Sequence, residues 1–197
     1  MRVAFSALLA EERPFLGTFV QSAAPEFVEA AGYAGFRFVA VDLEHTYYGP
    51  EKTAEMVRAG EAADLCVLAR VPVLDAVWIK KCLDMGASGV IVPNVDNAAQ
   101  AAEAVRLCRF APEGGRGACP GVRANRYGAG GTEYYAKANR EVVVIPLWSP
   151  RRGCGTSRRS SERRGSPQCS WGRWTCRWPW AGAGTRTTRR CGRPCWT

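Results

Sequence analysis

The stretches FRFVAVDLE, residues 36–44, and LCVLARVP, residues 65–72, decide the predicted fold. Each is a nearly continuous apolar run that contains or closes on charged side chains, as a strand covered on both faces would be. Between them, PEKTAEMVRAGEAA (50–63) has the periodicity of a helix. A strand, a helix and a second strand in this order predict a βαβ unit with parallel strands.

The same alternation extends in both directions. Strands are predicted at 15–21, 36–44, 65–72, 87–95 and 142–147, and helices at 24–35, 50–63, 75–86, 97–110 and 132–141. An open doubly wound sheet and a (β/α)₈ barrel both fit this pattern. No GxGxxG follows the first strand, and polar residues gather at the strand ends, where barrel enzymes carry their chemistry. We therefore predict an α/β fold, a TIM (β/α)₈ barrel that is incomplete here, with about five βα units.

The charged residues at the strand ends are the candidate catalytic residues. Asp42, Glu44 and His45 follow the second strand, and His45 is the only histidine. A carboxylate that fixes the imidazole tautomer and supports its protonation makes His45 a competent general base. Arg70 closes the third strand, where it forms either a salt bridge with a neighbouring acid or a clamp on a substrate carboxylate or enolate. Asp84, near the end of a helix, is either a solvated residue or part of the site.

Several ordered motifs carry a family resemblance, which covers about residues 15–147. They are GTFVQSAAPEFVEAAGYAGFRFVAVDLEHTYYGPE (17–51), VLARVP (67–72), IKKCLDMGASGVIVPNVDNAAQAAEAV (79–105) and RGACPGVRANRYG (116–128). This pattern resembles the HpcH/HpaI aldolase/citrate lyase family, most of all its 4-hydroxy-2-oxoacid (class II pyruvate) aldolase branch. The resemblance implies a (β/α)₈ barrel in a homo-oligomer, commonly a hexamer. It also implies reversible cleavage of a 4-hydroxy-2-oxo acid to pyruvate and an aldehyde, assisted by a divalent metal (Mg, Mn or Co).

The resemblance also implies roles for single residues. His45, paired with Asp42, corresponds to the acid/base; Arg70 corresponds to the group that holds the pyruvate oxygens and stabilises the enolate. Asp84 corresponds to a residue that reaches a neighbouring subunit's active site. The family takes its metal ligands from a Glu after the fifth strand and an Asp after the sixth, and these slots hold Ser149 and Thr175 here. Neither is an anionic ligand for a hard cation.

Residues 148–197 differ in composition from residues 1–147, so we divide the chain there. They hold twelve arginines, no lysine and one acid, Glu162, a formal charge of +11, whereas residues 1–147 carry −2. They contain six of the seven tryptophans, yet no Leu, Ile, Val, Met, Phe or Tyr. Natural disordered tails are poor in tryptophan. This composition is what GC-rich DNA encodes in a wrong reading frame.

The genetic code supports that interpretation, because Trp has the single codon TGG. Reading residues 171–176 (WGRWTC) one base earlier gives Gly at position 172, Asp at position 175 and Leu, Met or Val at position 176. The intervening positions allow Pro and Val, so this frame permits GPVDL, which resembles the metal-binding GPxDLS strand of the family. The same shift at Trp148 and Ser149 gives an NTG codon followed by the Glu codon GAG, if the serine codon is AGY. We therefore hypothesise a frameshift near codon 148.

Other interpretations of the tail remain open. The Arg–Trp alternation of WGRWTCRWPW (171–180) is typical of nucleic-acid binding by charge and stacking, which gives the alternative of a basic-tailed nucleic-acid-binding module. The five tail cysteines lack zinc-ligand spacing. For the function that the resemblance implies, a further alternative is an acyl-CoA-type lyase of the same superfamily.

Location and behaviour can also be predicted. Neither a signal peptide nor a membrane-spanning stretch is apparent, and the scattered cysteines Cys66, Cys82, Cys108 and Cys119 are typical of reduced thiols in a cytoplasmic protein. Because five of eight barrel strands leave open edges, we expect the chain as written to fold poorly, to aggregate and to lack metal-dependent aldolase activity.

Overall fold

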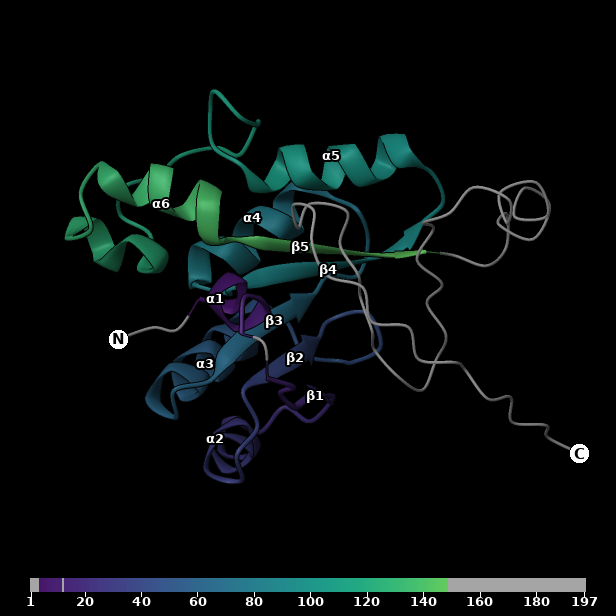
Figure 1. The fold of residues 1–197 in the computed structure, drawn as a ribbon, viewed down its shortest axis with the longest axis vertical. Helices are drawn as coiled ribbons and strands as arrows, with labels where there is room; N and C mark the ends of the chain where they lie inside the picture. The colour runs from purple at the N-terminus through teal and green to yellow at the C-terminus, as the bar shows by residue number, and fades with distance from the viewer. Residues whose placement is uncertain (1–3, 12, 149–197) are drawn as a thin grey trace, which may run out of the picture. The chain divides into compact units, whose positions relative to one another are not determined.

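The computed structural model describes residues 4–11 and 13–148. In this part of the chain one parallel sheet runs through β1 (Gly17–Val20), β2 (Phe38–Asp42), β3 (Cys66–Arg70), β4 (Gly89–Val95) and β5 (Val143–Trp148) (Figure 1). Successive strands are joined through α2 (Pro25–Tyr33), α3 (Pro50–Ala62), α4 (Ala76–Met85), α5 (Ala98–Cys108) and α6 (Glu133–Glu141). A short helix, α1 (Phe5–Leu9), precedes β1, and a 3₁₀ segment, η1 (Arg123–Gly128), precedes α6.

The strand order confirms the predicted fold. Each strand pairs in parallel with the next one along the chain, in the order β1-β2-β3-β4-β5. A doubly wound sheet would reverse its order at a switch point, whereas a (β/α)₈ barrel adds strands sequentially. The described residues therefore form five consecutive strands of a barrel-type fold. The predicted non-native tail, 148–197, lies outside the described residues except for Trp148, which ends β5.

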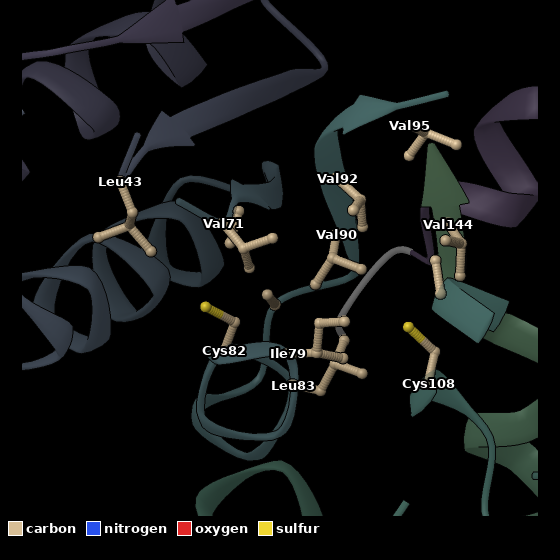
Figure 2. Close-up of a cluster of buried hydrophobic side chains, with 13 residues drawn as sticks. Leu43, Val71, Ile79, Cys82, Leu83, Val90, Val92, Val95, Cys108 and Val144 are labelled. Carbon is tan, nitrogen blue, oxygen red and sulfur yellow. The ribbon is translucent and has the colours of Figure 1, made fainter. Parts of the chain in front are cut away.

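The helices α2 to α5 cover one face of the sheet. Alternate strand residues such as Val39 and Val41 pack against α2 and α3. Figure 2 shows the second part of this core, where Val90 and Val92 of β4 lie over the buried side of α4. This part also contains Leu43, Ala69, Val71, Ile79, Cys82, Leu83, Ala87, Val95, Ala104, Cys108 and Val144. The outer layer of a barrel is built in this way.

The short helix α1 covers the opposite face. Its Phe5 and Leu8 are buried against Ala40, Leu68 and Ile91, which point away from the helical layer. Sequence periodicity did not predict α1, because five residues are too few to show a helical repeat. In a closed barrel this face would be the interior.

The ends of the longer helices follow the local signals in the sequence. Pro25 and Pro50 each occupy the first turn of a helix, where proline's missing N–H costs nothing. The Asp75 side chain caps α4 by accepting hydrogen bonds from the N–H groups of Val77 and Trp78. The helix ends at Gly86, whose φ of 109° favours glycine.

The alternation of side chains also places the functional residues. Asp42 is two residues after Ala40, and Arg70 is two residues after Leu68, so both share the face covered by α1. The ladder pairs Asp42 with Arg70 directly, at the carboxyl ends of β2 and β3. The fold thus brings two residues that are far apart in sequence to one sheet end.

Among the described residues, the thiols of Cys66, Cys82 and Cys108 are buried and that of Cys119 is exposed. Burial raises the pKa of Cys82 and of Cys108 to about 12, so both stay neutral and pack as small apolar side chains. None of the described helices combines the length and apolar character needed to span a bilayer.

Candidate active site

Asp42, the last residue of β2, is the most highly connected side chain at this end of the sheet. Its Oδ1 accepts hydrogen bonds from Nε of Arg70 at 2.8 Å and from the backbone N–H groups of Glu44 and His45 at 3.0 and 3.2 Å. Its Oδ2 accepts from Nε2 of Gln21 at 2.9 Å and from Nη2 of Arg70. Five donors therefore surround one fully buried carboxylate.

These contacts keep Asp42 ionised. Burial alone would raise the pKa of its carboxyl, but the hydrogen bonds from Arg70, Gln21 and the two backbone N–H groups outweigh it and lower the pKa to about 2. A proton carrier at neutral pH needs a pKa near 7. Asp42 is therefore a fixed negative charge at physiological pH.

Arg70, the last residue of β3, is held on three sides. Its Nε and Nη2 bind Asp42, its Nη1 lies 3.3 Å from Oε2 of Glu44, and its guanidinium carbon is 5.0 Å from the centre of the Phe19 ring. The side chain is buried. One of the two predicted alternatives for Arg70, a salt bridge with a neighbouring acid, is thus present. Nη1 is the guanidinium nitrogen that does not bind Asp42.

His45 follows β2 in a turn whose N–H groups point back to Asp42. Its ring is largely exposed, and its Nε2 lies 3.7 Å from Oε2 of Glu44. Asp42 contacts His45 through the backbone N–H, not through the imidazole. The expected pairing of the Asp42 carboxylate with the ring is therefore replaced by a pairing with Arg70, since the turn directs that carboxylate towards β3.

Asp84 lies away from this group. It is near the end of α4, which runs back along the sheet and finishes just before β4 begins, so it belongs to the amino end of the strands. Its Oδ1 accepts a hydrogen bond from Nη2 of the buried Arg116 at 2.6 Å. The structure therefore brings together Asp42, Arg70 and His45, and places Asp84 elsewhere in the same chain.

A surface hollow of about 320 Å³ lies beside Asp84, along α3 and α4. Its lining also includes Arg58, Lys81 and Arg123. The Arg123 guanidinium is held by Glu61 and by the Met85 carbonyl oxygen. None of the three residues clustered at the carboxyl ends, Asp42, His45 and Arg70, contributes to this hollow.

Sequence reasoning missed three participants. Gln21 directly follows β1, so the rule that selected Asp42 and Arg70 would have found it. Phe19 lies within β1 and is apolar, so a rule that selects polar residues at strand ends does not select it. Arg116 lies in a Gly-rich loop, and its burial over the Phe110 ring, 4.4 Å from the ring centre, has no sequence signal.

The described residues do not fit a divalent metal ion. No group of three or more His, Cys, Asp or Glu side chains among them is arranged to hold one. The two carboxylates at the sheet end, Asp42 and Glu44, are both engaged by Arg70. The positions that the resemblance assigns to metal ligands, Ser149 and Thr175, lie outside the described residues.

Comparison with known proteins identifies the family. Residues 16–147 match the model of the HpcH/HpaI aldolase/citrate lyase family. The chain belongs to this family. It is 39% identical over 145 residues to the 4-hydroxy-2-oxovalerate aldolase of Novosphingobium aromaticivorans, covering 72% of this chain and 53% of that protein. It is 38% identical over 130 residues to the 2-dehydro-3,6-dideoxy-6-sulfogluconate aldolase of Pseudomonas putida, covering 66% and 51%.

A solved structure supports the same assignment. The HpcH/HpaI family protein from Burkholderia cenocepacia J2315 superimposes with a TM-score of 0.70 at 31% identity, covering 76% of this chain and 60% of that one. The chain thus spans about half the length of the curated relatives it matches. The family match ends at residue 147, directly before the change in composition at Trp148.

Proposed function

We propose that this sequence encodes a carbon–carbon lyase that cleaves a 4-hydroxy-2-oxo acid to pyruvate and an aldehyde. The observation that carries the proposal is the cluster of Arg70, Asp42, Glu44 and His45 at the carboxyl ends of β2 and β3. Family membership and the two aldolase relatives support it, although those relatives are named for different substrates.

The chemistry of the proposed reaction fits the cluster. Cleavage begins when a base takes the proton of the 4-hydroxyl group, which we assign to the exposed imidazole of His45. The C3–C4 bond then breaks, the C4–O group becomes the aldehyde, and the bonding electrons form the enolate of pyruvate. Arg70 supplies the positive charge that stabilises this enolate, and Asp42 holds the guanidinium in place. Return of the proton to C3 completes pyruvate.

Asp84 and the divalent metal do not belong to the cluster at the carboxyl ends of β2 and β3, so their roles are proposed separately. Asp84 lies at the amino end of the sheet, away from Asp42 and Arg70. Following the resemblance, we propose that it serves the site of a neighbouring copy, within the hexamer that the resemblance also implies. A divalent ion, Mg, Mn or Co, would polarise the 2-oxo group. Since the described residues do not fit it, the ion would need the Glu and Asp codons of the shifted frame at positions 149 and 175.

The test compares the 197-residue chain with a version in which the shifted frame is restored from codon 148. The restored protein is expected to release pyruvate from a 4-hydroxy-2-oxo acid and to lose this activity with a chelator. His45→Ala should lower its turnover by about 10²- to 10⁴-fold, whereas Glu26→Gln, on the exposed first turn of α2, should not change it. The chain as written is expected to be inactive. A restored protein without activity, or a metal-dependent activity of the 197-residue chain, would contradict the proposal.

A further inference from the structure

The hollow of about 320 Å³ between α3 and α4 has no role of its own in the proposed function. Pro50, Ala54 and Arg58 recur every four residues, so they share the face of α3 that forms one wall. Lys81 and Met85, also four residues apart, share the face of α4 that forms the other wall. Ala54 has only a methyl side chain, so it leaves space between its longer neighbours. The volume lies at the lower end of the range typical of small-molecule sites, about 300–1,000 Å³.

Three cationic side chains line this hollow. Arg58 and Lys81 are exposed, and neither has a hydrogen-bond or ion-pair partner within the part of the chain that the structure describes. Arg123 is held in place: its Nη1 donates to the Met85 carbonyl oxygen at 2.8 Å, and its Nη1 and Nη2 donate to Glu61 at 3.2 and 2.5 Å. Two of the three charges are therefore free to bind a ligand, and the third has a fixed position.

The acids near the hollow do not cancel this positive charge. Among the described residues that line it, Asp84 is the one acid. Its Oδ1 accepts a hydrogen bond from Nη2 of Arg116 at 2.6 Å, so its charge is already compensated by a buried guanidinium. Glu61 is likewise engaged by Arg123. The lining therefore carries a net positive charge, which attracts anions.

The rest of the lining is apolar. Pro50, Ala54, Met85 and Val122 are half-buried and offer surface that a bare inorganic anion would leave uncovered. Mostly apolar walls with a few charged groups are typical of sites for small organic molecules. A guanidinium such as that of Arg58 binds carboxylate and phosphate groups through two parallel N–H donors. The hollow thus combines a place for an anionic group with a place for an apolar one.

We propose that the hollow between α3 and α4 binds a small organic anion, a carboxylate or phosphate that carries an apolar group. Arg58 and Lys81 bind the anionic group, and Met85 and Val122 contact the apolar group. Because the proposed function places Asp84 at the site of a neighbouring copy, the anion is either a free small molecule or the far end of a substrate held at that site. The site itself does not rest on the proposed function, and only the second source does.

The test follows lysine acylation in the dilute 197-residue chain by peptide mapping. The lysines are Lys52, Lys80, Lys81 and Lys137, so the arginine-rich residues 148–197 do not contribute to the readout. Phenyl phosphate should protect Lys81, with half of the effect at about 1 mM. Inorganic phosphate should need about tenfold more, because it has no ring to bury against the apolar lining. Lys80, adjacent in sequence but not part of the lining, should keep its rate, as should the other two lysines.

A matched pair of variants tests the role of Arg58. Arg58→Gln removes an exposed charge from the hollow, so Lys81 should need about tenfold more phenyl phosphate for the same protection. Arg140→Gln, the same change of charge in the last turn of α6, should leave the protection unchanged. Equal protection of all lysines would overturn the proposal. Inorganic phosphate as effective as phenyl phosphate, or protection that Arg58→Gln does not weaken, would overturn it as well.

The source of the anion is decided in the frame-restored protein. If Arg58→Gln raises KM for a 4-hydroxy-2-oxo acid with a second carboxylate, but not for a matched acid without one, the ligand is the far end of the substrate. If it changes neither KM, the ligand is a free small molecule. Both results uphold the site that lysine protection detects. The protection experiment needs no turnover, so its outcome is independent of whether the restored protein cleaves its substrate.

Discussion

Asp42 and Arg70 face each other across β2 and β3 in the ladder register and form a buried two-point ion pair. Burying two charges costs desolvation free energy, which is offset only when the pair is well oriented and further hydrogen bonds satisfy its remaining polar atoms. Here Gln21 and the backbone N–H groups of Glu44 and His45 donate the remaining hydrogen bonds to the Asp42 carboxylate. The ring of Phe19 lies against the guanidinium. The same ion pair therefore stabilises the end of the sheet and fixes the position of the guanidinium in the site.

Removing one partner of this pair should be costly. Asp42→Asn leaves the buried Arg70 charge with only its single contact to Glu44, so we expect the free energy of unfolding to fall by about 3 kcal/mol. Pulse proteolysis in urea on dilute protein measures this change. Glu55→Gln, which breaks the exposed pair with Lys52, is the matched control and should cost less than about 1 kcal/mol. Equal effects of the two changes would show that the pair does not stabilise the fold.

The same carboxyl gives a defined dependence on pH. Its pKa is lowered from 3.8 to about 2 on folding, so the ionised form stabilises the native state above about pH 4. That contribution, about 2 kcal/mol, is lost as the pH falls from about 4 to about 2. The difference in unfolding free energy between the parent and Asp42→Asn should therefore shrink over this range. A difference that stays constant down to about pH 2 would rule out Asp42 as the source.

Much of this site could be predicted from the sequence, but not the direction of its side chains. Apolar runs that end on charged residues placed Asp42 and Arg70 at strand ends, and the structure confirms both positions. The family resemblance implied that Asp42 pairs with His45. The turn instead folds the N–H groups of Glu44 and His45 back onto Asp42, which turns its carboxylate towards β3. That choice depends on a neighbouring strand, which local sequence does not reveal.

The buried guanidinium of Arg116 is paired with Asp84, and the contribution of this second pair to stability can also be tested. Asp84→Asn leaves the guanidinium of Arg116 buried over Phe110 without a counter-charge, so the free energy of unfolding should fall by about 3 kcal/mol. Replacing both partners, Asp84→Asn with Arg116→Met, should recover part of that loss, because an apolar side chain needs no counter-charge. Asp96→Asn, on the exposed surface, should change stability by less than about 0.5 kcal/mol. A double variant less stable than Asp84→Asn would contradict this account.

The reading-frame hypothesis makes a prediction about the gene itself. The family match ends at residue 147, and the sequence beyond it contains no Val, Leu, Ile or Met. A single-base insertion or deletion near codon 148 would explain both facts, and reversing it would restore a Glu codon at position 149 and an Asp codon at position 175. Resequencing the locus should find this difference, with AGY as the codon of Ser149. A serine codon of the TCN type at that position would remove the Glu, and with it the proposed metal site.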